Sequence, residues 1–181
     1  MPISTIPAAG LSSGVPTRAQ LPAGSVLQVV STTFTSEFSW TTKGSWVDMT
    51  GISASITPIS STSKIMVFLM LATGDGGNNF ERAYRILRDS SVIAEGPNTA
   101  SIMVRAQAGT GMGAFASNSV ICTIPITVLD SPTTTSSVTY KLQGWASASS
   151  STVSYINRPY SPSSSASATG ISTITLMEIA G

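Results

Sequence analysis

The sequence contains no histidine, and this absence narrows the chemistry that the chain can perform. Histidine is the usual general base near neutral pH and a common zinc ligand. A Ser-His-Asp or Cys-His catalytic arrangement therefore cannot be built within the chain. Carboxylates are few, and Asp89 and Asp130 stand in turn-like sequences, where they are expected to accept hydrogen bonds from backbone amides. We expect a protein that is not an enzyme and that needs no cofactor or metal.

Cysteine and charge are also scarce. Cys122 is the single cysteine, so no disulfide can form within the chain, and its place in an apolar stretch predicts a small core residue. Charged residues make up 9% of the sequence, against roughly 25% in an average soluble domain. The net charge of +1 gives no electrostatic footprint for nucleic acid. A surface of hydroxyl groups is typical of a particle that packs against copies of itself.

Long hydrophobic runs are absent as well. The longest apolar run, Ile65–Ala72, is far too short to cross a bilayer. The first residues, Met1–Thr5, lack the charged and apolar segments of a secretion signal. Neither a membrane protein nor a secreted C1q-like or lectin-like module is expected.

Strict alternation of apolar and polar residues organises the stretch Asn118–Ser147. The alternating apolar positions are Val120, Cys122, Ile124, Ile126 and Val128, then Val138, Tyr140 and Leu142. This pattern predicts two long, half-buried strands joined by a turn at Asp130-Ser131-Pro132.

Further strands are predicted along the rest of the chain. They are expected at Ser25–Thr33, Trp46–Met49, Ile52–Thr57, Lys64–Thr73, Phe80–Arg88, Ala100–Ala106, Val153–Asn157 and Gly170–Ile179. Phe80–Arg88 also has fair helix propensity, but its short length and the hairpin-like residues after it favour a strand. Gly74–Asn79 is expected to be a plain turn, because its acidic and amide side chains lack the spacing of a calcium loop. The set predicts an all-β, antiparallel jelly-roll sandwich over residues 25–181.

Residues 1–24 form a separate segment in this interpretation. Four prolines spread through it forbid a helix and spoil a sheet ladder. Isolated apolar residues recur along it, namely Ile3, Ile6, Leu11, Val15 and Leu21. A floppy tail is one interpretation, and an extended arm that becomes ordered on a partner surface is the favoured one, because a solvating linker has no need of apolar anchors.

Two of the predicted strands, Lys64–Thr73 and Gly170–Ile179, are apolar on both faces. In a sandwich one face meets the opposite sheet, and something else must cover the second face. A neighbouring subunit is the expected cover. The predicted interface residues are Met66, Phe68, Met70, Ile174 and Leu176.

Several segments together resemble a known family. They are Leu21–Val30, Ile52–Lys64, Leu87–Ser91, Leu129–Pro132 with Tyr140–Gln143, and Ile171–Glu178. As a set they resemble small virion structural proteins of tailed bacteriophages, especially aquatic and cyanobacterial ones, and the likeness extends from Leu21 to the end. The resemblance implies a virion location and a homotrimer of jelly rolls similar to the tumour-necrosis-factor and C1q heads.

Two functions are compatible with that resemblance. The first is a capsid decoration (cement) protein on the virion exterior, bound to the major capsid protein or other virion proteins through the arm, because no heptad repeat or stalk is present. The second is a short tail fibre or fibre tip that binds a host surface glycan. Trp40 and Tyr160, in loop-like surroundings, are then the expected receptor contacts, although a tryptophan in a sandwich more often lies in the core.

Overall fold

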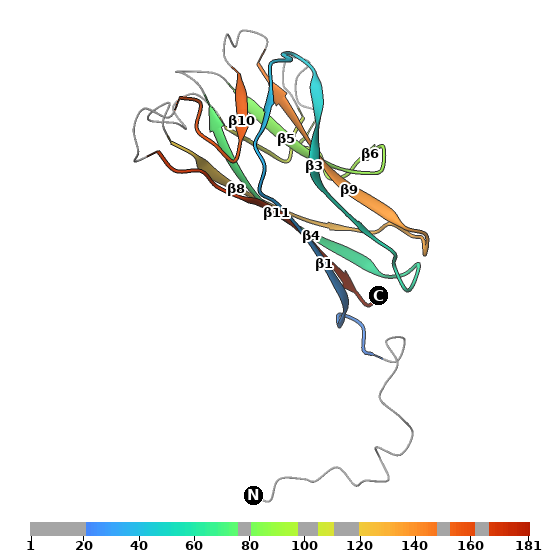
Figure 1. Ribbon diagram of the computed structural model, residues 1–181. Coiled ribbons are helices and arrows are strands. Elements are labelled where there is room, and N and C mark those ends of the chain that lie inside the picture. Colours follow the sequence, from blue (N-terminus) through green and yellow to red (C-terminus); the bar gives the residue numbers. More distant parts are fainter. Residues whose placement is uncertain (1–20, 76–80, 98–104, 111–119, 148–152, 162–166) are drawn as a thin grey trace, which may run out of the picture.

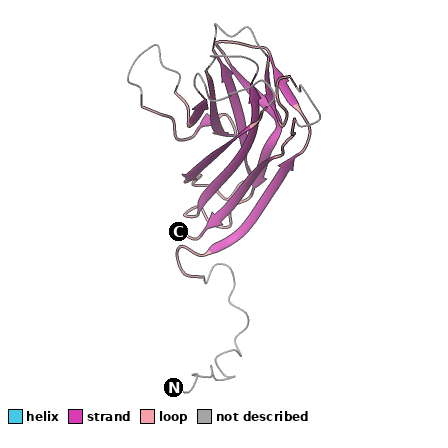
Figure 2. Ribbon diagram, turned by 90° about the vertical axis from the view of Figure 1, so that its left-hand side faces the viewer, coloured by secondary structure: helices cyan, strands magenta, loops and turns pink. Residues whose placement is uncertain are grey.

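The computed structural model describes residues 21–75, 81–97, 105–110, 120–147, 153–161 and 167–181. In these residues eleven strands build two antiparallel sheets that lie face to face (Figures 1 and 2). Sheet A contains β1 (Val26–Phe34), β2 (Phe38–Trp40), β4 (Lys64–Asp75), β8 (Cys122–Asp130), β10 (Ser154–Ile156) and β11 (Ser172–Ile179). Sheet B contains β3 (Trp46–Ile56), β5 (Arg82–Arg88), β6 (Ser91–Val92), β7 (Ala108–Thr110) and β9 (Val138–Ala146). The described residues contain no helix able to span a membrane.

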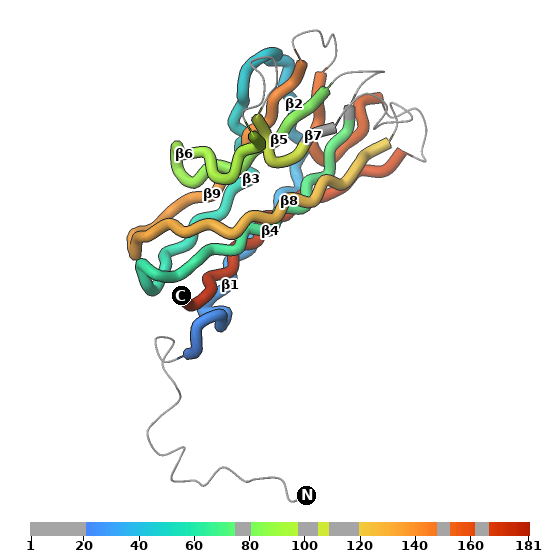
Figure 3. Tube along the Cα trace, turned by 180° about the vertical axis from the view of Figure 1, so that it is seen from behind, coloured from blue at the N-terminus to red at the C-terminus, as the bar shows by residue number. Residues whose placement is uncertain are grey.

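The chain crosses repeatedly from one sheet to the other, which gives the predicted jelly-roll sandwich. Sheet A has the order β1-β11-β4-β8, with β10 and β2 extending it beside the end of β4 (Figure 3). Sheet B has the order β3-β9-β5, with β6 and β7 beside β5. β3, β4 and β5 alternate between sheets, as do β8 and β9, so neighbours in sequence seal opposite walls of one core. The predicted all-β fold is confirmed, whereas residues 1–20 of the predicted N-terminal arm lie outside the described residues.

Most predicted strands are found, with three differences. Trp46–Met49 and Ile52–Thr57 are parts of one strand, β3, whose pairing with β9 shifts near Gly51. Gly51 has a φ of +96°, and a Cβ there would lie 2.6 Å from the Phe34 ring, so glycine is required at this bend. Ala100–Ala106 falls largely outside the described residues. The two long strands β8 and β9 do not pair with each other but lie in different sheets.

The core lies between the sheets and is filled by alternate residues of the long strands. It includes Ile65, Val67, Leu69 and Leu71 of β4, Tyr140 and Leu142 of β9, and Ile174 and Leu176 of β11. Trp40 belongs to the same core and is 5% exposed. Cys122 is a free thiol at the margin, partly exposed rather than in the core as predicted.

Polar side chains join the two sheets at several points. Thr73 of β4 and Tyr84 of β5 share a hydrogen bond of 2.8 Å between their hydroxyls. The Asp130 carboxylate accepts a hydrogen bond of 2.7 Å from the Tyr140 hydroxyl and lies 2.5 Å from Arg88 Nη1. Burial, together with the negative charge of Asp130, raises the pKa of the Tyr140 hydroxyl, so it stays a donor.

Asp89 and Asp130 were both expected to bind backbone amides at turns, and only one is found doing so. Asp89 Oδ1 accepts a hydrogen bond of 2.9 Å from the Thr139 amide, so its partner is a backbone amide, as predicted. Asp130 instead binds the Arg88 and Tyr140 side chains of sheet B. The sequence around Asp130 indicates the turn correctly, but the partners of its carboxylate come from distant strands.

Asn157 joins four segments of sheet A at one buried point. Its side-chain amide donates to the carbonyl oxygens of Phe34 and Ser36, at 2.8 and 2.9 Å. Its side-chain oxygen accepts a hydrogen bond of 2.7 Å from Ser172, and its backbone amide donates to Ala72 O. The residue is 1% exposed and has a φ of +66°, a region that asparagine tolerates better than most residues.

Replacing Asn157 is expected to destabilise the sandwich strongly. Asn157→Ala removes the donors to the carbonyl oxygens of Phe34 and Ser36 and the acceptor of the buried Ser172 hydroxyl, at a cost of ~2–4 kcal/mol. Asn157→Gly loses the same bonds but relieves the positive φ, so it should be less destabilising than the alanine variant by up to ~1 kcal/mol. Urea unfolding measures both differences. An alanine variant as stable as the wild type would show that this junction does not hold sheet A together.

Candidate interaction surfaces

The two outer faces of the sandwich carry different kinds of side chain, apolar on sheet A and charged or polar on sheet B. Both sets are the outward residues of alternating strands. In β4 every second residue, counted from Phe68, points away from the core. In β11 the same holds for every second residue counted from Met177. Met66 pairs with Met177 on one side and with Leu129 on the other, and Met177 pairs with Val29. One apolar row therefore runs across β1, β11, β4 and β8.

We call this surface the apolar face of sheet A. It consists of Val29, Met66, Phe68, Met70, Leu129, Met177 and Ile179. Val29 is 52% exposed, Leu129 49%, Met70 46% and Phe68 38%, so these large side chains meet water in the single chain. The remaining outward positions of these four strands carry Val26, Ala72 and Gly74 and otherwise serine, threonine and proline, and Lys64 is the charged residue at the margin. A contiguous apolar surface of this kind marks an interaction site.

The predicted interface residues divide between the two sides of the sheet. Met66, Phe68 and Met70 lie on the outer face as expected, and their role in an interface stays a prediction. Ile174 and Leu176 were placed there wrongly, because they are 1% and 0% exposed and belong to the core. Ile174 pairs with Leu69 and Leu176 with Val67, and these two β4 residues both face inward.

Glu178 fixes the strands that carry the apolar face. It is fully buried, and its carboxylate accepts hydrogen bonds from Gln28 Nε2 at 2.6 Å and from the Ile59 amide at 2.7 Å. Gln28 Nε2 also donates to Thr57 O, so β1, β11 and the segment after β3 meet here. Burial alone would raise the pKa of Glu178, but these hydrogen bonds outweigh burial and hold the pKa below its ordinary value.

The outer face of sheet B carries a continuous polar network that sequence patterns did not reveal. Lys141 Nζ lies 2.7 Å from Asp48 Oδ2, and Gln143 donates to Asp48 Oδ1 at 2.6 Å. Arg85 Nε donates to Gln143 at 2.9 Å, and Arg85 also pairs with Glu95 at 3.2 Å. Arg105 pairs with the other oxygen of Glu95 at 3.0 Å. The alternation of Lys141 and Gln143 was visible in the sequence, but their partners lie on other elements.

Aromatic residues lie beside this network. Trp46 of β3 and Trp145 of β9 are paired in register, and both are half-buried. The Arg85 guanidinium lies 4.1 Å from the centroid of the Trp46 ring, a cation–π contact.

The two predicted receptor contacts have different outcomes. Trp40 is buried in the core, because β2 pairs with β10 and directs its ring inward, so its role as a receptor contact is wrong. Tyr160 is half-buried, and its ring lies 5.9 Å from that of Tyr155. Arg158 lies over the Tyr155 ring at 4.7 Å and pairs with the exposed Glu37 at 3.2 Å. A receptor role for Tyr160 stays a prediction.

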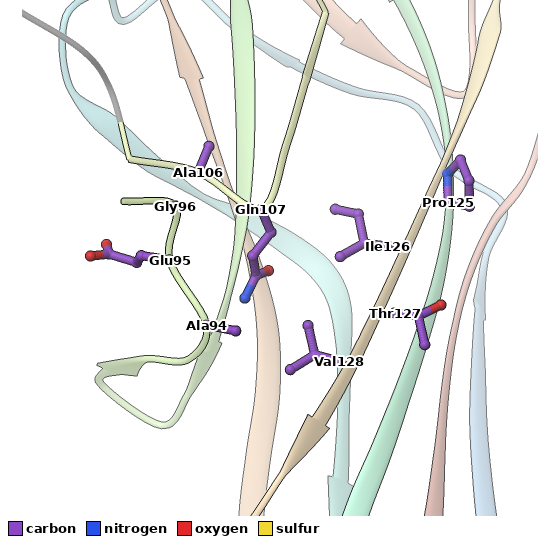
Figure 4. A pocket seen from close by; sticks show the side chains of 9 residues that line it. All are labelled: Ala94, Glu95, Gly96, Ala106, Gln107, Pro125, Ile126, Thr127 and Val128. Carbon is purple, nitrogen blue, oxygen red and sulfur yellow. The ribbon is translucent and has the colours of Figure 1, made fainter. Parts of the chain in front are cut away.

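A hollow of about 350 Å³ opens between β8 and the segment that includes Glu95 and Gln107 (Figure 4). Ile126 and Val128 point into it from β8, and the Gln107 side chain faces them. Gln107 Oε1 accepts a hydrogen bond of 2.7 Å from the Ile86 amide, and its Nε2 donates to Ile93 O. The Gln107 side chain is thus occupied in joining β5 to the segment after β6.

The remaining predicted residues lie mostly beyond the described part of the chain. Ile3, Ile6, Leu11 and Val15 of the arm fall in residues 1–20, while Leu21 is exposed before β1. The loop considered for calcium begins inside β4 and continues into residues 76–80, which are not described. Within the described ranges, no three acidic or cysteine side chains gather in a way that could hold a metal ion.

Comparison with known proteins gives similarity to solved structures alone. No family model matches the sequence, and no curated protein matches it. A structure of infectious bursal disease virus, Gx strain, has a TM-score of 0.44 and 15% identity over 88% of this chain. A mutant VP2 protein of that virus in T=1 particles has a TM-score of 0.45 and 14% identity over 85% of this chain, and a VP2 subviral particle has 0.43 and 13% over 85%. The matched region spans 36% to 37% of those chains.

Glu178 is expected to make stability depend on acid. Its folded-state pKa lies below the unfolded value of about 4.3, so the ionised group stabilises the fold above that pH, and this contribution is lost as pH falls through the folded pKa. The free energy of unfolding of the wild type, measured with urea, should therefore fall between about pH 5 and pH 3. That of Glu178→Gln should fall less steeply over the same range. Glu37→Gln, at a site that is 57% exposed, is the control. Equal pH slopes for the wild type and Glu178→Gln would refute this role.

Proposed function

We propose that this chain is a structural protein of a bacteriophage virion, a homotrimer that decorates the outside of the capsid. The observation that carries the proposal is the apolar face of sheet A, which crosses four strands and is exposed in the single chain. Burying large apolar side chains contributes about 25 cal/mol per Å² of surface removed from water. Three copies that turn this face toward a common axis cover one another and leave sheet B outward.

The sequence supports the same role. The set of segments from Leu21 onward resembles phage virion proteins, and the chain lacks the histidine that the commonest catalytic arrangements use. A particle component also has little need of surface charge when much of its surface is covered by neighbours, which suits a charged content of 9%. The partner of the trimer is the major capsid protein or another virion protein.

The arm is proposed to hold the trimer on the capsid. β1 begins at the end of the sandwich where the C-terminus also lies, so residues 1–20 join the sandwich at that end (Figure 1). Gly24 there donates a hydrogen bond of 2.8 Å to Ala180 O. The spaced apolar residues of the arm then bind between capsid subunits.

A tail-fibre component is the second candidate. The surface cluster of Tyr155, Tyr160 and Arg158 favours it, because aromatic rings at a surface suit recognition of a host glycan. A cryo-EM map of the virion separates the two candidates. Density of this trimer on the capsid lattice supports decoration, and density at the tail alone supports the fibre.

Charge placed on the apolar face is expected to separate the subunits. Phe68→Glu combined with Met70→Glu should convert the trimer to a folded monomer, because both side chains are exposed in the single chain and would be buried between copies in the proposed trimer. Sedimentation equilibrium measures the mass, and circular dichroism checks the fold. Thr50→Glu, at an exposed position of β3 in the other sheet, should leave the trimer intact. A monomeric wild type, or a variant that stays trimeric, counts against this interface.

Removing the arm is expected to abolish capsid binding without unfolding the trimer. A chain lacking residues 1–20 keeps every strand described here, so its thermal unfolding and mass per trimer should match those of the full chain. Co-sedimentation with capsids stripped of the protein measures binding. If the shortened trimer still co-sediments as well as the full one, the arm is not the anchor.

A further inference from the structure

Two of the three tryptophans stand side by side on the outer face of sheet B. Trp46 pairs with Trp145, and the next outward pair along the same strands is Asp48 with Gln143. The residues between them face inward, since Val47 packs against the core and a Cβ at Gly144 would strike Met49. Alternation therefore puts the two indoles and these two polar side chains on one surface.

This surface also gathers an unusual share of the chain's charge. The whole sequence has nine basic and eight acidic residues. Five of them, Asp48, Arg85, Glu95, Arg105 and Lys141, belong to the network on this face, together with Gln143. Exposed ion pairs of this kind typically stabilise a fold by only ~0–1 kcal/mol each, so stability gives little reason for the concentration.

The polar groups are held in place before any ligand arrives. Gln143 is fixed between Asp48 and Arg85, and Arg85 is fixed further by Glu95 and by the Trp46 ring. Hydrogen bonds from Lys141 and Gln143 lower the pKa of Asp48, which keeps its carboxylate an acceptor at neutral pH. Side chains fixed in this way lose little conformational entropy when a ligand binds.

The groups nevertheless stay open to solvent. The side chain of Asp48 is 51% exposed, that of Arg105 is 45% exposed and that of Lys141 is 31% exposed. A carboxylate oxygen has two lone pairs, and each oxygen of Asp48 accepts one hydrogen bond from the network, Oδ2 from Lys141 and Oδ1 from Gln143. Acceptor capacity therefore remains at the centre of the face, with further donors at its margins.

We propose that this face binds a carbohydrate, with a sugar ring packed against Trp145, beside the Trp46–Arg85 pair, and its hydroxyl groups bound by Asp48, Gln143 and Lys141. The C–H bonds of a pyranose suit the electron-rich face of an indole. Neighbouring hydroxyls suit a row of fixed carboxylate, amide and ammonium groups, which present both acceptors and donors. Two acids and three bases make the network mildly cationic, so uronic-acid sugars fit as well as neutral ones.

This site is independent of the proposed assembly. The apolar face that would join the subunits belongs to sheet A, on the other side of the sandwich. A trimer closed through sheet A leaves the carbohydrate site outward on each subunit, whether the protein sits on a capsid or a tail. Loss of sugar binding and loss of assembly are thus separate results.

The test is binding of the full-length protein to an array of defined neutral and uronic-acid oligosaccharides, followed by calorimetry with the best-bound sugar. Asp48→Asn, which changes an exposed side chain with little effect on folding, and Trp145→Ala should each weaken the affinity by at least about tenfold. Glu37→Gln, which changes an exposed carboxylate outside this network, is the matched control and should bind as the wild type does. Tyr160→Ala tests the separate aromatic cluster after β10. Thermal unfolding checks that each variant is folded.

Three results would overturn the proposal. One is that the wild type retains no sugar of the array at about 1 mM. Another is undiminished binding by both Asp48→Asn and folded Trp145→Ala. The third is binding lost in Tyr160→Ala but kept in the sheet B variants, which would move the site to the Tyr155–Tyr160 cluster.

Discussion

The fold depends on one strand that is apolar on both faces. β4 lies inside sheet A between β11 and β8, and its inward residues fill the core against sheet B. Its outward residues Phe68 and Met70 have no covering layer within the described residues, although they are as apolar as those inside. A strand of this composition gains stability when both of its faces are removed from water. The core covers the inner face, and the proposed association of subunits would cover the outer one.

The scarcity of charge explains why the two outer faces differ. A chain with nine basic and eight acidic residues has too few charged groups to make both faces of a sandwich strongly charged. The charged groups of the outer surface are concentrated on sheet B, where Asp48, Lys141, Arg85 and Glu95 hold one another in place. Sheet A is left with methionine, valine, leucine and hydroxyl side chains. The division gives one face suited to copies of the chain and one suited to polar ligands.

Alternation in the sequence predicted strands and faces well, because it depends on a single chain segment. It revealed β4, β8, β9 and β11 close to their observed bounds, and the outward position of Met66, Phe68 and Met70. It failed where pairing with a distant strand determines which side chains point into the core. β11 is apolar at both parities, and its register with β4 turned Ile174 and Leu176 inward. Trp40 is buried because short β2 pairs with β10, more than a hundred residues away in sequence. The polar network on sheet B likewise joins elements whose proximity only the fold creates.

The pairing of β1 with β11 has a consequence for how the protein is made. Val26 of β1 lies opposite Ile179 of β11. The first strand of the sandwich therefore cannot pair with its neighbour in sheet A until β11 has been synthesised. During synthesis β4 emerges long before β11, and its apolar residues then have neither their final neighbour nor a closed core. Such a nascent chain is prone to wrong contacts with other copies. Sheet A therefore gains its central pairing only after β11 has left the ribosome.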